Sequence, residues 1–463
     1  MQACLHSHPK QFRQCLEAAI VDSVLWTQAE VAAKGRAIDA VVQLLQRTSS
    51  NGALRIAGQL VTIDRFAVAG SVGKGVSVQD DFDIDLVAFV NIPTAGMSDP
   101  PFSINLADPD VTHNSVWMRQ LQQQVLACLR QPGGLSAGAE ITGGVRQGRT
   151  AITFVLSVLV PESGDEVELE VDVLLAPNLA AGAGAVAAAK LGVRGGEPAD
   201  IQRRAVLAPV LALANKAIST RRRGLYTHER NMFEVVGPSY ARNIWLTEAA
   251  TEFVQQAAVA AADSGHLSGR VVSSTIRLVK AWVRRGLQPQ GPGFKKLKSF
   301  MIELIVLHAA QTFGSRQRAA AVSSYGGFGG RYVLDLLLES LGVMVEWANA
   351  ADPAAAAGPF AAPEQPILFT ELVGGKYYSS EQAKALMTLP LPGATSCYGP
   401  GQAEIRKQFS VMPVVVHPVD PASNVFAQEE GRRFVLWGVL RREALLLLQQ
   451  LKQYSWEEIM QES

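Results

Sequence analysis

The chain has 463 residues, of which 48% are hydrophobic and 18% are charged, so it can bury a substantial core in two or three domains. Forty-two Lys and Arg balance forty-two Asp and Glu, which excludes a global basic field and limits any polyanion site to a local patch. The cysteines form no C-x-x-C pair, which argues against a disulfide framework and a ribbon-type zinc site. Without a long apolar run or a signal-peptide pattern, we expect no membrane partner and a cytoplasmic or, alternatively, nuclear location.

The first part of the chain reads as an α/β unit. Apolar residues recur at helical spacing over residues 12–45, which predicts a long leading helix interrupted near Gly35. The period then changes: residues 60–68 read as strand, residues 70–75 as a glycine-rich turn and residues 83–90 as a second strand.

Three further elements complete this unit. Residues 116–129 have the pattern of a helix, and two strands over residues 151–160 and 166–175 flank a turn that contains Pro and Gly. Together these elements predict a small mixed sheet with helices on one side.

The second half is predicted to be mainly helical. Alanine and other helix formers dominate it, and helix-period apolar residues occur at 205–217, 244–262, 271–285, 297–312 and 333–348. Stretches rich in Ala, Gly and Pro predict loops at residues 192–198, 349–366 and 390–401.

Two aspartates in one predicted strand carry the strongest chemical signal. Asp83 and Asp85 alternate with Ile84, so both carboxylates point to the same face while Ile84 points to the core. Neighbouring carboxylates repel unless positive charge lies between them, and a pair of Mg²⁺ ions serves that purpose in phosphoryl transfer. The strand V-E-L-E-V-D-V over residues 167–173 supplies a third carboxylate, for which Asp172 is the best candidate.

The run G-S-V-G-K-G at residues 70–75 precedes these aspartates. Backbone N–H groups at Gly70 and Ser71, where a strand gives way to a helix, can form a nest for phosphate oxygens. A Walker A loop is excluded because Val68 and Gly75 stand where Gly and Ser or Thr are required. Val78 likewise excludes a dinucleotide-binding fingerprint. Taken alone, the motif is also compatible with a turn followed by an edge strand with a solvated polar face.

The run from Gly70 to Phe89 resembles the nucleotidyltransferase superfamily, and specifically the branch of 2'-5'-oligoadenylate synthetases and cyclic GMP-AMP synthase-like receptors. Later segments in the same order strengthen the resemblance: L-E-V-D-V at 169–173, the helix at 246–256, I-R-L-V-K-A-W at 276–282 and M-P-V-V-V-H-P-V-D-P-A-S-N at 412–424.

The resemblance implies an α/β + α architecture: a bilobed nucleotidyltransferase fold whose polymerase beta-like mixed sheet carries the catalytic carboxylates, plus a helical lobe. Residues 1–190 would form the leading helix and catalytic core, and residues 191–463 the helical lobe, with insertions at about 192–240 and 349–405. The implied activity is template-independent synthesis of 2'-5'-linked oligoadenylates from ATP, activated by double-stranded RNA in innate immune or antiviral signalling.

The resemblance also assigns roles to residues. Asp83, Asp85 and Asp172 would be catalytic and would bind two Mg²⁺ ions, with Mn²⁺ as an alternative. The nucleotide, ATP or alternatively GTP, would be bound by a set of five residues: Gly70, Ser71, Lys280, Ser299 and Phe300. Lys280 would reach the phosphates and Phe300 would stack on the base. From sequence alone, Phe300 reads equally well as a core residue.

Departures from the family concern the RNA contact. Thr251 and Gln255 stand where the synthetases carry basic RNA contacts, so we expect that contact to be weakened or relocated. Basic residues elsewhere are the candidates for a phosphate-tracking face: Lys34, Arg36, Arg55, Arg284, Arg285, Lys295 and Lys296. Each of them also fits an ordinary solvated surface.

Three alternatives to this interpretation stay open. One is a cyclic dinucleotide or oligonucleotide synthase of the same family, because the motifs do not encode how the acceptor ribose is turned. A second is a terminal nucleotidyltransferase, against which the ending at residues 412–424 argues. The third is a nucleic-acid sensor without catalysis, against which the three aspartates argue. The sequence does not indicate an oligomeric state.

Overall fold

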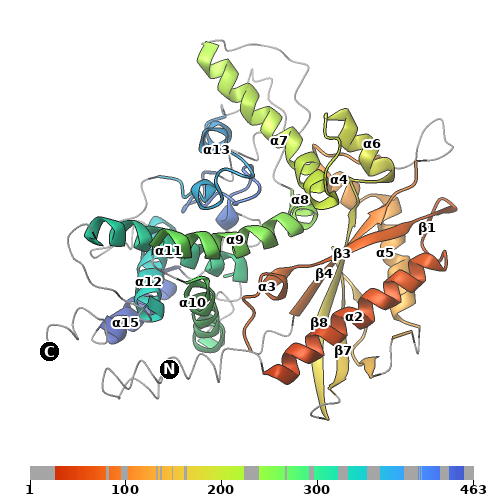
Figure 1. Ribbon diagram of the computed structural model, residues 1–463, viewed down its shortest axis with the longest axis horizontal. Helices are drawn as coiled ribbons and strands as arrows, with labels where there is room; N and C mark the ends of the chain where they lie inside the picture. Colours follow the sequence, from red (N-terminus) through yellow and green to blue (C-terminus); the bar gives the residue numbers. More distant parts are fainter. Residues whose placement is uncertain are drawn as a thin grey trace.

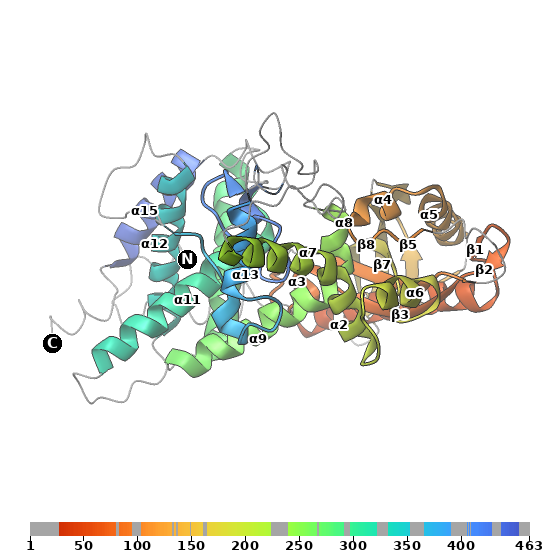
Figure 2. The ribbon, with the colours of Figure 1, turned by 90° about the horizontal axis from the view of Figure 1, so that it is seen from above.

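A computed structural model of the chain describes residues 27–79, 83–94, 103–131, 134–135, 138–148, 150–160, 164–223, 239–265, 268–290, 297–321, 332–351, 365–389, 405, 407, 409–427 and 437–452. These residues form a lobe built on a sheet and a lobe built from helices, which lie side by side (Figures 1 and 2). The predicted α/β + α architecture is therefore confirmed.

The first lobe is built on a six-stranded sheet with the order β3-β4-β8-β7-β5, in which β6 also pairs with β7. The strands are β3 (Thr62–Val68), β4 (Asp83–Asn91), β5 (Ala139–Ile141), β6 (Arg146–Gln147), β7 (Ala151–Val160) and β8 (Asp165–Pro177). β4 and β8 pair in parallel, and the other pairings are antiparallel. The mixed sheet expected from the sequence is thus present.

One face of the sheet packs against α2 (Gln28–Ser50) and α5 (Val116–Leu129), and Figure 1 shows α2 lying over the sheet. Thr27 begins α2 with a capping box, because its side chain accepts from the backbone of Glu30 and the Glu30 side chain accepts in return. Val41 and Leu45 of α2 then pack against Ile84 and its neighbours on β4. The part of the predicted leading helix before Thr27 lies outside the described residues.

The opposite face of the sheet joins the core of the helical lobe. Val87 and Phe89 of β4 alternate with Ile84 and belong to the same cluster of buried residues as the helices of the second lobe. Smaller elements surround the sheet: β1 (Arg55–Ile56), β2 (Gln59–Leu60), α3 (Gly70–Gly73), α4 (Pro109–His113) and α6 (Gly182–Lys190).

The helical lobe contains the helices that the sequence predicted, with shifted or extended bounds: α7 (Pro198–Arg223), α9 (Thr247–Gly265), α10 (Gly269–Trp282), α11 (Ser299–Ala321) and α12 (Tyr332–Ala351). α10 continues into a π-helical turn, Val283–Leu287, and a 3-10 turn, Gln288–Gln290. The remaining elements are α8 (Tyr240–Trp245), the 3-10 turns Thr370–Val373 and Val425–Ala427, α13 (Ser380–Met387) and α15 (Trp437–Lys452). None of the described helices is long and apolar enough to cross a bilayer.

Two segments expected as insertions contribute to this lobe. Leu207 and Val210 of α7 are buried in the core, although α7 lies within the stretch 192–240. Leu386 of α13 is likewise buried, within the stretch 349–405. Described parts of both stretches are therefore built into the lobe rather than placed around it.

The motif at residues 412–424 forms a buried polar cluster. Asp420 is fully buried, as is Arg242 of α8, and Arg242 Nη1 lies 3.1 Å from Asp420 Oδ2. Asn424 donates to the carbonyl of Val411 at 2.9 Å and accepts from the backbone N–H of Val415 at 3.1 Å. Because every one of these groups needs a partner once buried, the motif fixes the path of this segment.

Candidate functional site

The parallel pairing of β4 with β8 brings the predicted carboxylates together. In this pairing Asp85 stands opposite Asp172, and Asp83 stands opposite Glu170. Along β8 the exposure alternates, with Leu169, Val171 and Val173 buried on the other face. Asp83, Asp85 and Asp172 therefore share the sheet face that turns toward the helical lobe.

Asp172 is oriented by its other neighbouring strand. Thr153 of β7 lies opposite Asp172, and its hydroxyl donates a hydrogen bond to Asp172 Oδ1. The Asp172 carboxylate is half-buried, and this hydrogen bond fixes one of its two oxygens.

The glycine-rich turn lies directly against Asp85. α3 begins at Gly70, whose φ of +60° lies in the left-handed region that favours glycine. A Cβ at this position would stand 2.0 Å from Asp85 Oδ2, so only glycine lets the turn approach the carboxylate this closely. The backbone N–H of Ala69 donates to the carbonyl of Asp85 at 2.7 Å, and Ser71 is buried beside it.

The helical lobe holds the carbonyl groups of this turn. Gln255 of α9 donates to the carbonyl of Gly73 at 2.9 Å, and Arg277 of α10 donates to the carbonyl of Gly75. Lys280 Nζ, also on α10, lies 3.2 Å from the carbonyl of Val76. Burial lowers the pKa of Arg277, but the reference pKa of arginine is so high that the group stays charged.

A buried carboxylate links two lysines next to the turn. Glu303 of α11 is fully buried, with Oε2 2.9 Å from Lys74 Nζ and Oε1 2.8 Å from Lys280 Nζ. Burial disfavours the charged form of Glu303, but the two lysines outweigh burial and hold the pKa of Glu303 below its ordinary value. Lys280, predicted to reach phosphates, is itself fully buried and paired with Glu303 in this structure.

The predicted base-binding residues lie at the start of α11. Ser299 is its first residue, and the half-buried ring of Phe300 has Lys74 Nζ 4.2 Å from its centroid. The ring of His417 is 5.1 Å from that of Phe300, and burial lowers the pKa of His417 to about 4. Phe300 thus lies between the glycine turn and the motif at 412–424, within the region where the turn meets the helical lobe.

The donor chemistry of the site fits Mg²⁺, because hard divalent cations take oxygen ligands. The backbone register places Asp85 beside Asp172 on adjacent strands, with Asp83 two residues away on the same face. As the side chains stand, no three His, Cys, Asp or Glu within the described part of the chain converge closely enough to hold one ion.

The basic residues predicted for an RNA face are not all exposed. Lys34 is only 6% exposed, because it lies on the side of α2 that packs on the sheet. Arg36 is exposed near the start of α2, whereas Arg55 follows its far end, about 20 Å along the helix axis. Arg55 also donates to the carbonyls of Gly52 and Gly58, each at 3.0 Å, within a local turn.

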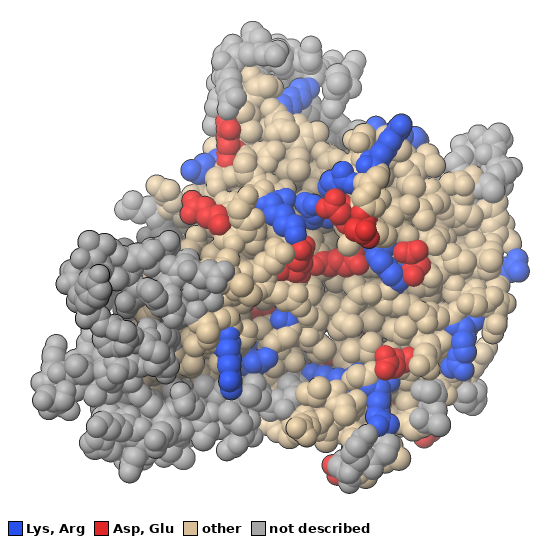
Figure 3. Space-filling model, viewed as in Figure 1, with Lys and Arg blue, Asp and Glu red and all other residues tan. Residues whose placement is uncertain are grey.

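The second group of basic candidates follows α10. Arg284 is half-buried and Arg285 is exposed in the π-helical turn, while Lys295 and Lys296 lie outside the described residues. On the face shown in Figure 3, the described Lys and Arg side chains alternate with Asp and Glu and do not gather into one basic field.

Sequence reasoning missed the contacts of Lys74, Glu303 and Gln255. Lys74 stands within the glycine run, but its partner Glu303 is 229 positions away in the chain. Gln255 was interpreted only as a lost RNA contact, whereas the structure places its amide on the glycine turn. The one available signal was Glu303 itself, a charged residue within the otherwise apolar start of α11.

No protein-family model matches the chain, and no curated protein matches it in sequence. Among solved structures, CdnC of E. coli MS115-1 with ATP is 13% identical, with a TM-score of 0.42, covering 95% of this chain and 91% of that chain. The same CdnC in complex with HORMA-deltaN is 14% identical, with a TM-score of 0.42, covering 95% and 90%. The CD-NTase CdnG of Bradyrhizobium diazoefficiens with GTP is 9% identical, with a TM-score of 0.39, covering 95% and 91%.

Proposed function

We propose that this protein is a nucleotidyltransferase. The observation that supports the proposal is the juxtaposition of Asp85, Asp172 and Gly70: two carboxylates side by side on parallel strands, with the glycine turn against one of them. Carboxylates next to a backbone turn that can bind phosphate are the combination that phosphoryl transfer needs.

In the proposed reaction, a ribose hydroxyl of an acceptor nucleotide attacks the α-phosphate of a nucleoside triphosphate. A phosphodiester bond forms, the bond between the α- and β-phosphates breaks, and pyrophosphate leaves. The triphosphate would lie against α3, where the backbone N–H of Ser71 and the Ser71 hydroxyl would contact its oxygens. Asp172, with one oxygen occupied by Thr153, would accept the proton of the attacking hydroxyl.

Asp83, Asp85 and Asp172 would hold two Mg²⁺ ions, with Mn²⁺ as the alternative. When bound, these ions would neutralise the triphosphate and stabilise the attacking and leaving oxygens. The chain itself contributes the pairing of β4 with β8, which places Asp85 opposite Asp172, and the close approach of the glycine turn to Asp85.

Lys280 remains the proposed contact for the phosphates, but with a condition. Because Lys280 pairs with Glu303 in this structure, it would act on a phosphate only after that pair opens. Lys74, within the turn, pairs with the other oxygen of the same carboxylate, so a phosphate bound there would compete with Glu303 for both lysines.

At a finer level, we propose ATP as the donor, with Phe300 stacking on its base, and 2'-5'-linked oligoadenylates as the product. GTP is the alternative donor. Double-stranded RNA is the proposed activator, in antiviral signalling, although burial of Lys34 reduces the number of exposed basic residues to which it would bind.

The test is incubation of the purified protein with labelled ATP, labelled GTP and Mg²⁺, with and without double-stranded RNA. Products are resolved before and after digestion with a nuclease specific for 3'-5' bonds. We expect a nuclease-resistant ladder from ATP that depends on RNA. A single cyclic species would instead assign the alternative product, and no incorporation under any condition would refute the proposed activity.

Matched variants connect the product to the site. Asp85→Asn and Asp172→Asn should each lower incorporation at least about 100-fold, because the ionised carboxylates are required. Glu168→Gln is the control, since Glu168 lies on the same face of β8 as Asp172 but is exposed. Equal loss in Glu168→Gln and Asp172→Asn would show that the assigned aspartates are not the specific site.

A further inference from the structure

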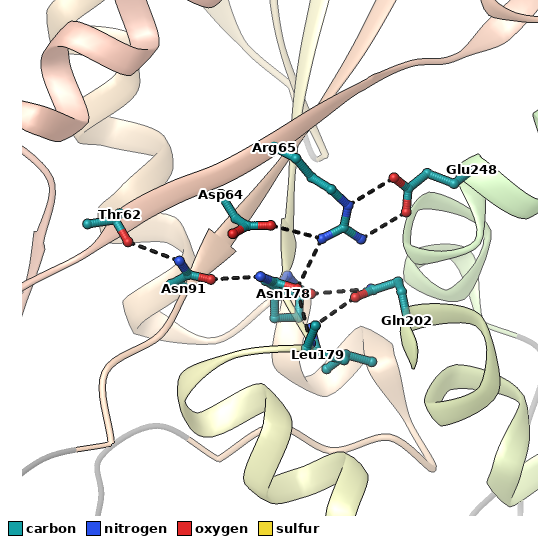
Figure 4. A network of polar contacts seen from close by, with 10 residues as sticks. Thr62, Asp64, Arg65, Asn91, Asn178, Leu179, Gln202 and Glu248 are labelled. Atoms are coloured by element: carbon teal, nitrogen blue, oxygen red, sulfur yellow. Dashed lines mark hydrogen bonds and ion pairs between the residues drawn. The ribbon is translucent and has the colours of Figure 1, made fainter. Parts of the chain in front are cut away.

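A second contact between the lobes lies about 13 Å along β4 from Asp85, where β3 pairs with Phe89 of β4. Figure 4 shows this network, which is centred on Arg65 of β3. Arg65 binds Glu248 of α9 through two parallel hydrogen bonds, from Nε to Oε1 and from Nη2 to Oε2, each 2.9 Å long. Such a bidentate pair fixes both distance and orientation.

The guanidinium of Arg65 is held on its remaining sides as well. Its Nη1 donates to Asn178 Oδ1 at 3.0 Å, and its Cζ lies 4.0 Å from the centroid of the Phe89 ring. Asn178 in turn donates to Asn91 Oδ1 at 2.8 Å, so the ends of β4 and β8 are joined to the same network. Arg65 is therefore rigidly placed on the sheet rather than free to follow α9.

Glu248 is the first of three positions along one side of α9 that meet the sheet lobe. Thr251 follows three residues later and lies next to Gly73: a Cβ added to Gly73 would stand 3.7 Å from the Thr251 methyl group. Gln255 follows after four more residues and donates to the carbonyl of Gly73 at 2.9 Å. Positions i, i+3 and i+7 share one face of a helix, so α9 lies along β3 and reaches α3 two turns after Glu248.

We propose that Arg65 and Glu248 are positioning residues for the glycine turn: their bidentate pair sets where α9 lies, and α9 then holds the carbonyl of Gly73 through Gln255. The inference rests on the proposed function for its catalytic consequence, because the position of the turn sets its distance from Asp85. The mechanical part of the inference can be measured without nucleotide.

The decisive experiment is hydrogen exchange of the peptide that spans residues 69–76. Its amides close the turn, for example from Gly73 to the carbonyl of Ala69 at 3.0 Å and from Val76 to that of Ser71 at 3.0 Å. Glu248→Gln keeps the size of the side chain and removes its charge. We expect this variant to speed exchange of the turn about fivefold, although the substituted residue is two helical turns from Gln255.

A control on the same helix is available. Glu252 of α9 pairs with Lys376 on a partly exposed side of the helix, with side-chain exposures of 41% and 33%. Lys376→Gln breaks an ion pair of α9 without touching the sheet lobe, and it should leave exchange of residues 69–76 unchanged. Arg65→Lys, which keeps the charge but loses the bidentate geometry, should act like Glu248→Gln.

Kinetics provide the second measurement. In Glu248→Gln we expect kcat to fall about tenfold with KM for the triphosphate changed less than about twofold, since a displaced turn misaligns the reacting groups. The double variant Arg65→Gln with Glu248→Gln should be no slower than Arg65→Gln alone, because Arg65→Gln already removes the pair with Glu248.

The outcomes separate the two proposals. Faster exchange confined to residues around Arg65 and Glu248, with the turn unchanged in both Glu248→Gln and Arg65→Lys, would overturn the positioning role. If the wild-type protein incorporates no nucleotide, the proposed function fails, and the exchange of residues 69–76 still decides the mechanical inference.

Discussion

At the scale of single residues, Gly70 shows how one missing side chain shapes the candidate site. Its positive φ is shared with Gly75, five residues later in the same turn. The two positions differ in their surroundings: a Cβ at Gly70 would stand 2.0 Å from Asp85 Oδ2, whereas a Cβ at Gly75 would have no atom within 4 Å. Substituting each glycine in turn therefore distinguishes the effect of backbone strain, which both positions share, from that of a clash with the Asp85 carboxylate, which only Gly70 would cause.

We predict that Gly70→Ala abolishes nucleotide incorporation, with a loss of at least about 100-fold, because Asp85 or the turn must move. Gly75→Ala should retain activity within about threefold and lose about 1 kcal/mol of stability, since its cost is only the left-handed backbone. Initial rates and urea unfolding of both variants provide the measurement. Equal activities in the two variants would contradict the proposed contact between turn and carboxylate.

Some properties of single residues could be predicted from the sequence and others could not. Alternation along residues 167–173 was sufficient to place Asp172 on the polar face, because a period of two is a local property. Lys280 was assigned to phosphates by resemblance, yet its pairing with Glu303 depends on how α10 packs on α11. No local pattern encodes such a pairing, since it joins two helices across the core.

At the scale of elements, strongly periodic segments were predicted and weakly patterned ones were not. The spacing at residues 116–129 matches α5, and the strands at 151–160 and 166–175 match β7 and β8. α6 was missed because its sequence of Ala and Gly carries almost no hydrophobic contrast. The short strands β5 and β6 were missed because two or three residues show no reliable period.

α8 illustrates how a short helix depends on another element. Its first N–H groups have a partner in Asp110 of α4, which accepts from Ala241 at 2.7 Å, from Tyr240 at 3.2 Å and from the Ser239 hydroxyl at 3.1 Å. A carboxylate at a helix N-terminus also interacts favourably with the helix dipole.

We predict that Asp110→Ala lowers the free energy of unfolding by about 1–2 kcal/mol, the usual cost of losing a helix cap. Asp39→Ala on α2 is the control, because Asp39 is exposed, and it should change stability by less than about 0.5 kcal/mol. Urea unfolding followed by circular dichroism measures both variants. A cost for Asp110→Ala no larger than that of the control would mean that the cap is dispensable.

At the scale of the whole molecule, two buried histidines make stability depend on pH. Burial lowers the pKa of His308 to about 4 and that of His417 to about 4. In the unfolded chain a histidine titrates near pH 6.5, so between pH 6.5 and pH 4 the unfolded state binds more protons than the folded state. Stability is therefore lost as the pH falls through this range.

We predict that lowering the pH from 7 to 5 reduces the free energy of unfolding by about 1–2 kcal/mol for each of these histidines. This range lies above the pKa of ordinary carboxylates, so the histidines dominate the change. His308→Gln should remove roughly half of it. Urea unfolding at several pH values measures the slope, and an unchanged slope in His308→Gln would refute the assignment.

The pairing of β4 with β8 also bears on how the molecule acquires its native state. It joins Asp85 to Asp172, 172 − 85 = 87 positions apart, so this contact closes a long loop and forms slowly. The antiparallel β7–β8 hairpin is local and can form first, which presents β8 to β4 already in order. A slip of one residue between β4 and β8 would turn Val171 or Val173 toward the helical lobe and Asp172 toward α2. The rate at which activity returns after refolding would then measure how fast β4 and β8 reach their native pairing.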